Sequence, residues 1–184
     1  TSKYRRELLA RLGLPFEIAS PQVDETALPQ EAPQDTARRL AEAKARAVAL
    51  RFPQAILIGS DQVAVLEGMP LGKPGNHATA LRQLKAMRGK EVVFHTALCL
   101  CDAASGQVQT RVVPFYVRFR DYSDAEIERY LQREQPYDCA GSARCEGLGI
   151  ALIAEMRGDD PNALIGLPLI ALTEMLAAQG VSVL

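Results

Sequence analysis

The sequence predicts an α/β fold in which helices flank a mixed sheet that is split by a cleft. Helical and strand patterns alternate along the 184 residues, and one long antiparallel hairpin is expected in the middle. That hairpin argues against a doubly wound parallel sheet. With 48% hydrophobic residues, the chain can bury a sizeable core, and we expect a single domain over residues 1–184.

The first half of the sequence alternates two helical patterns with two short strand patterns. Gly13 and Pro15 end the first helix and Pro53 ends the second, because both residue types interrupt a helix. The second strand is a branched, apolar run that delivers Asp61 at its carboxyl end, where open α/β sheets usually place chemistry. The helices are expected over residues 7–12 and 35–51, and the strands over 16–19 and 55–59.

The second half carries stronger local signals. Asn76 can cap the helix that follows it, and Ser123 with Glu126 forms a capping box that begins another. Cys99 and Cys101 alternate within a strand, so both should face one side of it as ordinary core thiols. The expected elements are a hairpin over 63–66 and 69–71, helices over 77–87, 124–131 and 168–178, and strands over 92–101, 108–120 and 150–153.

Charge and composition limit the partners of this chain. The 21 basic and 22 acidic residues leave no overall field that would attract nucleic acid or an anionic membrane, so local charges must hold any anionic ligand. No apolar run approaches the roughly 20 residues of a membrane span, and we expect a cytoplasmic protein. The four cysteines form no Cys-x-x-Cys pair, and His77 and His95 support no Ser-His-Asp arrangement.

Several polar residues could carry chemistry, although each also has a simpler structural reading. Asp61 could accept a proton from water or hold a divalent cation, but aspartates also end strands as turn formers. Glu25, beside Asp24, offers oxygen ligands for magnesium or manganese, or is a turn acid. Arg5 and Arg6 could meet phosphate oxygens at a helix N-terminus, or form surface charge.

Lys73 lies in the turn Gly72-Lys73-Pro74, which is only loosely similar to a phosphate-binding turn. The turn lacks the Walker arrangement of glycines followed by Lys and Ser or Thr, so a P-loop is excluded. Taken alone, Lys73 is most simply a solvated lysine.

Eight short motifs, in one order, resemble the Maf family of nucleotide pyrophosphatases along nearly the whole chain. Each motif is weak alone, and the shared order makes the resemblance specific. The family normally begins with a short apolar strand, so we expect the first strand of the domain to be missing at the start of this sequence, and Ser2-Lys3 stands where Ser-Pro is usual. The motifs occupy residues 2–9, 23–25, 43–45, 59–63, 72–74, 140–142, 146–147 and 166–168.

The resemblance implies an elongated, twisted sheet flanked by helices, in two lobes with a central cleft, as in the inosine-triphosphatase-like enzymes. It also implies cleavage of a nucleoside triphosphate between the α and β phosphates, with a divalent cation (magnesium, manganese or cobalt) as cofactor. Asp61 matches the family's proton acceptor, and Glu25 matches an acidic position that helps Asp61 to hold the metal. The basic phosphate-side positions are matched by Arg6, Lys44 and Lys73, with Arg5 close by.

Three positions associated with the substrate branch within the family are matched by Tyr4, Gln62 and Glu146. This trio resembles the branch that acts on 7-methylguanosine triphosphate, whereas the branch for thymidine and uridine triphosphates has arginine, threonine and glutamine. The Glu146 carboxylate can accept hydrogen bonds from N1–H and the amino group of guanine. N7-methylation makes the base cationic, which favours an acidic partner and a stacking ring such as Tyr4. The simpler readings are helix packing for Tyr4 and a turn acid for Glu146.

Two other functions stay open beside the 7-methyl-GTP pyrophosphatase. One is a dTTP/UTP pyrophosphatase of the same family, and the other is a non-enzymatic, nucleotide-binding regulator of cell division. A pure binder has no need for a proton acceptor, which argues against the regulator. The exposed sheet edge left by the hairpin makes a homodimer plausible.

Overall fold

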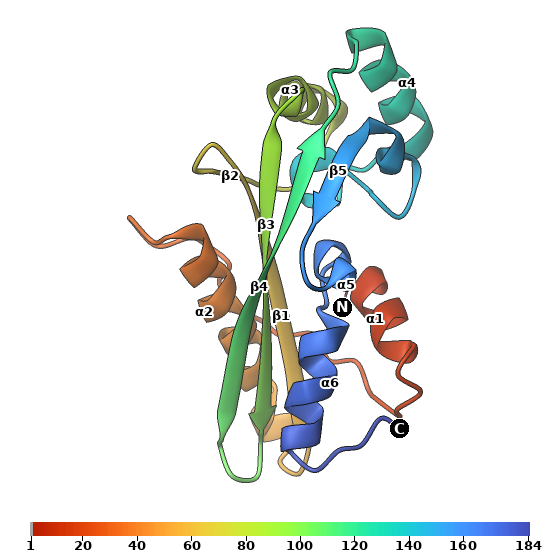
Figure 1. Cartoon of the computed structure of the whole chain (residues 1–184). Coiled ribbons are helices and arrows are strands. Elements are labelled where there is room, and N and C mark those ends of the chain that lie inside the picture. Colours follow the sequence, from red (N-terminus) through yellow and green to blue (C-terminus); the bar gives the residue numbers. More distant parts are fainter. Residues whose placement is uncertain (1) are drawn as a thin grey trace. The chain divides into compact units, whose positions relative to one another are not determined.

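The chain folds into a five-stranded sheet with helices beside it, and the computed structural model describes residues 2–184 (Figure 1). The predicted α/β class is confirmed. The strand order is β2-β1-β3-β4-β5, and the β1–β2 and β4–β5 pairs are antiparallel. The strands are β1 (Ile56–Leu66), β2 (Met69–Leu71), β3 (Glu91–Asp102), β4 (Val108–Phe119) and β5 (Ile153–Arg157).

Side-chain caps begin four of the six α-helices within residues 2–184, and the two caps predicted from the sequence are confirmed. Asn76 accepts a hydrogen bond from the Thr79 amide at 2.9 Å, and Ser123 with Glu126 forms the expected capping box. Within residues 2–184, no helix combines the length and the apolar character that a membrane crossing requires. The α-helices are α1 (Lys3–Ala10), α2 (Pro33–Arg46), α3 (His77–Met87), α4 (Asp124–Glu134), α5 (Pro161–Ile165) and α6 (Leu169–Ala178), and 3₁₀ turns cover Ala49–Arg51, Ala140–Ser142 and Leu148–Leu152.

Strand β1 continues beyond the point where the sequence pattern placed its end. The prediction that Asp61 lies at the carboxyl end of a strand is wrong, because Asp61 lies in the middle of β1. The apolar run ends before Ser60, but the backbone stays in the sheet as far as the hairpin with β2, where Leu66 pairs with Met69. The apolar pattern therefore predicted too short a strand, because polar side chains that have hydrogen-bond partners can continue it.

Two further elements differ from the predictions. Residues 16–19 form no strand, and the side chains of Phe16 and Ile18 are exposed, so the apolar pattern there was misleading. The last strand begins at Ile153 rather than ending there, because a 3₁₀ turn occupies 148–152. Helix α5 was missed, although the Asp160-Pro161 pair is a typical helix start.

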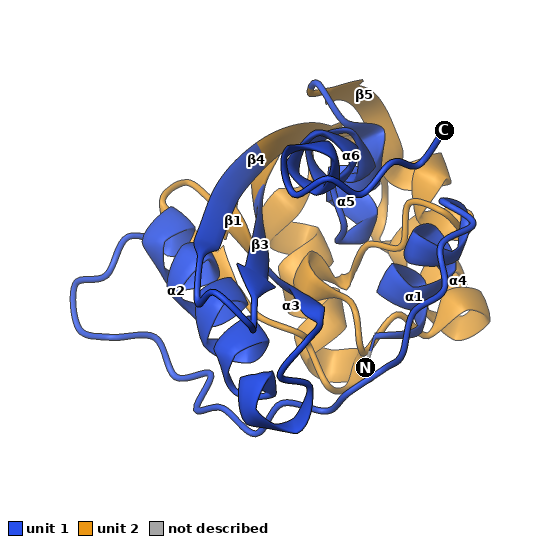
Figure 2. Cartoon of the chain, turned by 90° about the horizontal axis from the view of Figure 1, so that it is seen from below, with its two compact units in different colours: residues 1–62, 95–113, 159–184 blue, residues 63–94, 114–158 orange. Residues whose placement is uncertain are grey.

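The chain divides into two compact units, shown in two colours in Figure 2. Strands β1, β3 and β4 contribute residues to both. Unit 1 comprises residues 1–62, 95–113 and 159–184, of which 2–62 are described at its start, and unit 2 comprises 63–94 and 114–158.

Unit 1 has three layers, with α2 on one side of its strands and α6 on the other (Figures 1 and 2). Leu98 and Leu100 of β3 pack in one core cluster with Leu8 of α1 and with α6. The alternate residues Cys99 and Cys101 are buried and point to the opposite face, as predicted. Burial raises the pKa of the Cys99 thiol to about 11, which keeps it protonated as a core residue.

The core of unit 2 lies between α3, α4 and those parts of the sheet strands that belong to unit 2. Tyr122 is almost fully buried, its hydroxyl donates to the Leu84 carbonyl at 2.7 Å, and its ring meets Phe119 edge-on. Ile127 and Leu131 present the apolar side of α4 to this core. The core of unit 2 thus fixes α3 and α4 against each other, and both helices border the motifs that the sequence singled out.

Candidate active site

The candidate site in unit 1 begins with a close approach between α2 and β1. A Cβ atom at Gly59 would lie 2.1 Å from the carbonyl oxygen of Ala41 and 2.8 Å from the amide nitrogen of Ala45. Only glycine fits there, because real Cβ atoms do not approach backbone atoms so closely. This contact aligns Lys44 of α2 with Asp61, which lies two residues beyond Gly59 on β1.

Lys44 lies between two carboxylates. Its Nζ is 2.7 Å from Oδ1 of Asp61 and 2.9 Å from Oε1 of Glu25. The side chains of Asp61 and Lys44 are 10% and 13% exposed, whereas that of Glu25 is 61% exposed. A buried charge is stable when it is paired, and the contact with Lys44 pairs the Asp61 carboxylate and orients one of its oxygens. The other oxygen, Oδ2, receives no hydrogen bond from residues 2–184 and is available as a base or a ligand.

Arg5 holds the backbone around Asp61 in place. Its Nη1 donates to the Ser60 carbonyl at 2.7 Å, and its Nε donates to the Gly166 carbonyl at 2.8 Å. Burial lowers the pKa of Arg5, and the negative charges of Asp61 and Glu25 act in the opposite direction. Arg5 thus joins α1, β1 and the loop before α6, and its charge lies close to the carboxylates.

Gln62 is held from inside unit 1. Its Nε2 donates to Thr96 Oγ1 at 2.8 Å and lies 2.9 Å and 3.0 Å from the carbonyl oxygens of Ala163 and Leu164. A side-chain amide nitrogen has two hydrogens, so these acceptors already engage it fully. Only the carbonyl oxygen of Gln62 remains to meet a ligand, and that oxygen accepts and does not donate.

The other predicted residues lie on the surface of their units. Tyr4 and Arg6 belong to α1 in unit 1, where the Lys3 ammonium lies 4.8 Å from the centre of the Tyr4 ring and Arg6 is exposed. Lys73 and Glu146 belong to unit 2. Lys73 is exposed in the turn between β2 and α3, and Glu146 accepts a hydrogen bond from Nε of Arg144 at 3.3 Å.

Three supporting residues were missed by sequence reasoning. The Ser60 hydroxyl donates to the Gly166 carbonyl at 2.9 Å, and the buried Thr96 hydroxyl donates to the Ala163 carbonyl at 2.8 Å. Asp160 caps α5 through the Asn162 amide and accepts from the Ile170 amide at 2.7 Å. The Asp160-Pro161 pair carried a local signal and Ser60 lies within the motif at residues 59–63, whereas nothing local marks Thr96.

The donor set fits a divalent cation only in part. Glu25 and Asp61 each place one oxygen within 3 Å of a common point, and hard cations prefer such carboxylate oxygens. Among residues 2–184, no three or more His, Cys, Asp or Glu side chains are grouped so that they could hold a metal ion by themselves. The two carboxylates therefore suit a cation that takes its remaining ligands from phosphate and water, as magnesium usually does in nucleotide sites.

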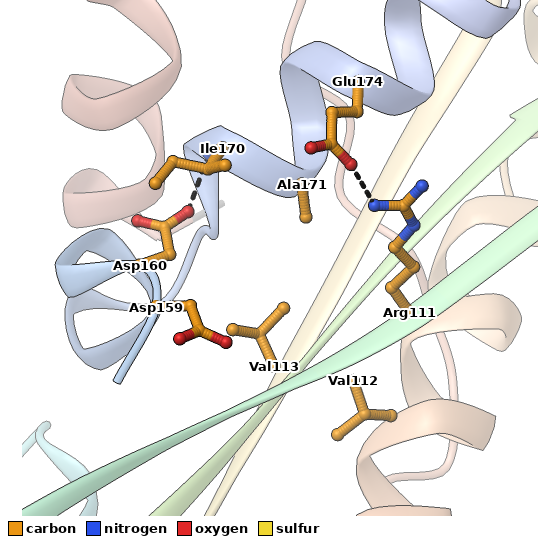
Figure 3. Close-up of a pocket in the computed structure, with 8 residues that line it drawn as sticks. All are labelled: Arg111, Val112, Val113, Asp159, Asp160, Ile170, Ala171 and Glu174. Atoms are coloured by element: carbon orange, nitrogen blue, oxygen red, sulfur yellow. Dashed lines mark hydrogen bonds and ion pairs between the residues drawn. The ribbon is translucent and has the colours of Figure 1, made fainter. Parts of the chain in front are cut away.

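A hollow of about 400 Å³ elsewhere in unit 1 is not this site (Figure 3). Arg111 and Glu174 on its wall pair with each other at 2.5 Å, and Asp160 is engaged by the Ile170 amide. Arg111, Glu174 and Asp160 are thus already partnered, and the hollow contains neither Asp61 nor Lys44. Its lining consists of Arg111, Val112, Val113, Asp159, Asp160, Ile170, Ala171 and Glu174.

Fold and site together define an α/β protein in which an interior strand carries a buried carboxylate that is oriented by a lysine and lies close to the charge of an arginine. Comparison with known proteins makes this class specific: residues 1–179 match the family described as Maf-like protein, and the chain belongs to that family. It is 63% identical to a 7-methyl-GTP pyrophosphatase of Methylobacillus flagellatus over 100% of this chain and 96% of that protein. It is 59% identical to one of Nitrosococcus oceani and 60% identical to one of Thiobacillus denitrificans, each over 100% of this chain and 92% of the relative.

Proposed function

We propose that this chain hydrolyses 7-methyl-GTP to the nucleoside monophosphate and pyrophosphate. The observation that carries the proposal is the Asp61 carboxylate, held by Lys44 through one oxygen with the other left available. The names of three relatives that are 59–63% identical over the full chain support the same activity and substrate.

The proposed chemistry follows from these charges. Asp61 takes a proton from water, the water oxygen attacks the α phosphorus, and the bond to the bridging oxygen breaks so that pyrophosphate leaves. Lys44 holds one oxygen of the Asp61 carboxylate in place for this step. Arg6, Lys44 and Lys73 are assigned to neutralise charge on the phosphate oxygens, which is the main source of rate enhancement in phosphoryl transfer.

A divalent cation is proposed to be held by Glu25 and Asp61 together with the phosphates. Bound there, it would act as a Lewis acid and reduce the negative charge that repels the attacking water. Either carboxylate can exchange its contact with Lys44 for a contact with the cation, because both already converge on one positive group.

Chelation is expected to abolish pyrophosphate release, and excess magnesium, manganese or cobalt should restore it. Glu25→Gln should raise the cation concentration needed for half-maximal activity by about 10-fold or more, the usual scale of a weakened metal site. Glu17→Gln, an exposed change in the same loop, is the control. Full activity in chelator would refute the cation, and an unchanged requirement in Glu25→Gln would remove Glu25 from its site.

Base selection is assigned to Glu146 and Tyr4, with the free carbonyl of Gln62 as a further acceptor. Glu146→Gln should reduce the preference for 7-methyl-GTP over GTP by about 10-fold, because a neutral amide no longer attracts the positive charge that N7-methylation gives the base. The ratio of the two kcat/KM values measures this. Glu155→Gln on β5 is the matched control in unit 2, and an unaltered ratio in Glu146→Gln would contradict the base-edge argument.

Pyrophosphate release from a panel of 7-methyl-GTP, GTP, dTTP and UTP tests the function as a whole. The highest kcat/KM is expected for 7-methyl-GTP. A preference for dTTP or UTP would assign the chain to the other substrate branch, and binding without release would support the regulator.

Two broader properties concern the location and the assembly of the chain. A cytoplasmic location agrees with the nucleotide substrate and with the absence of any disulfide within residues 2–184, since reducing compartments keep thiols reduced. A homodimer through one of the sheet edges, β2 or β5, stays a prediction.

A further inference from the structure

The turn that carries Lys73 is held on both sides within unit 2. On one side, the Gly72 carbonyl accepts from Nε2 of Gln83 at 3.0 Å and from the Gly141 amide at 3.4 Å. On the other side, the Gly75 amide donates to the Tyr137 carbonyl at 3.0 Å. Lys73 itself is exposed between these fixed points, so its backbone is restrained while its ammonium reaches solvent.

Gln83 of α3 joins this turn to a second one. While its Nε2 donates to Gly72, its Oε1 accepts from the Ser142 hydroxyl at 2.5 Å. The orientation of the amide follows from chemistry, because a backbone carbonyl can only accept and must face the NH₂ group. One side chain thus links residues 72 and 142, which are far apart in the sequence.

Ser142 is an unusual residue for such a contact. It is fully buried and has a φ of 57°, a left-handed conformation that costs a non-glycine residue energy. Its carbonyl accepts from the Tyr130 hydroxyl at 3.1 Å, so both its side chain and its backbone are engaged. The surroundings therefore stabilise a strained turn in the position where Gln83 reaches it.

The same network continues to the loop of Glu146. The Tyr130 oxygen also accepts from the Arg144 amide at 3.0 Å, and the Arg144 guanidinium contacts Glu146 at 3.3 Å and Glu134 at 2.8 Å. A Cβ at Gly147 would lie 2.6 Å from the Glu134 carboxylate, which packs this loop tightly. A continuous chain of contacts therefore leads from the turn of Lys73, through Gln83, to Glu146. Lys73 and Glu146 are the two residues of unit 2 that are assigned to the substrate.

We propose that Gln83 is a positioning residue that acts through Lys73, by fixing the Gly72-Lys73-Pro74 turn against the 140–142 turn. The inference rests on the proposed function, in which Lys73 binds phosphate. Without the side-chain amide of Gln83, the Gly72 carbonyl loses one of its hydrogen-bond donors, and the turn loses its link to Ser142. The ammonium of Lys73 then samples several positions, and a misplacement of about 1 Å at a catalytic site can cost as much as about 10²-fold.

A double-mutant cycle tests this proposal with four proteins: wild type, Lys73→Met, Gln83→Met and the double variant. Methionine has the length of glutamine and a good helix propensity, so α3 should be retained. We expect Gln83→Met to lower kcat/KM for 7-methyl-GTP by about 10-fold or more and to lower it by less than about 2-fold when Lys73 is already methionine. Gln83→Glu, which keeps the acceptor for Ser142 but loses the donor to Gly72, should match Gln83→Met.

Hydrogen exchange supplies a readout that does not depend on turnover. Peptides that cover the turns at 72–75 and 140–142 should exchange faster in Gln83→Met than in wild type. Arg82→Met, on the same helix and exposed, should change neither exchange nor kcat/KM. Thermal unfolding verifies that each variant is folded.

Three kinetic results would overturn the proposal: wild-type kcat/KM in Gln83→Met, wild-type kcat/KM in Lys73→Met, or losses that multiply in the double variant. Multiplied losses would mean that Gln83 acts independently of Lys73. If wild type releases no pyrophosphate from any nucleotide, the proposed function fails, and hydrogen exchange alone decides the inference. Unchanged exchange at both turns would then refute the positioning role.

Discussion

Replacing Asp61 with asparagine is expected to lower turnover by about 10²-fold or more, the scale of a lost general base. Asparagine has nearly the shape of aspartate and can still accept from Lys44, but its amide does not take a proton from water. Lys44 keeps Glu25 at 2.9 Å, so the change does not leave a buried ammonium without a partner. The chain should therefore fold while its chemistry is lost.

The measurement is kcat for pyrophosphate release from 7-methyl-GTP, with thermal unfolding of the same samples. Asp159→Asn, an exposed acid of unit 1, is the matched control and should retain wild-type turnover. Wild-type turnover in folded Asp61→Asn would remove Asp61 from the centre of the mechanism.

Replacing Gly59 with alanine is expected to have the largest effect on stability. The added methyl group would lie 2.1 Å from the Ala41 carbonyl, so α2 has to move away from β1. Overpacking against backbone atoms should destabilise the fold by about 3 kcal/mol or more, at the upper end of such substitutions. Because α2 carries Lys44, the shift should also separate Lys44 from Asp61 and reduce activity in the protein that remains folded.

Denaturant unfolding measures this loss as the change in the free energy of unfolding. Gly72→Ala is the control, because a Cβ there meets nothing within 4 Å and the backbone is not left-handed, so a change within about 0.5 kcal/mol is expected. Equal stabilities of Gly59→Ala and wild type would show that α2 and β1 do not need this close approach.

Local chemistry explains the elements that were predicted well. The caps at Asn76 and Ser123 act within three residues of themselves, so the sequence contains the whole interaction. Elements that depend on distant partners were predicted poorly. Residues 16–19 have a strand pattern but no strand beside them, and β1 continues through polar residues because Ser60 and Gln62 find partners near residue 165.

The candidate site was likewise predicted only in part from the sequence. The motif resemblance named Asp61, Lys44 and Glu25 without any distance, and the structure places Nζ of Lys44 within 3 Å of one oxygen of each carboxylate. The same resemblance assigned Gln62 to the base and Arg5 to phosphate, and the structure shows that both already make hydrogen bonds inside unit 1.

The sequence by itself determined the α/β class, the helix starts at Asn76 and Ser123, and the family, because these depend on short-range patterns and on the order of motifs. Only the tertiary structure decided that Asp61 lies within β1, that Lys44 joins it to Glu25, and that Gln83 links two turns of unit 2. These contacts connect residues that are 11 to 59 positions apart, and their geometry depends on how the helices pack on the sheet. Such packing, as at Gly59, is a property of the folded chain and has no local sequence signature.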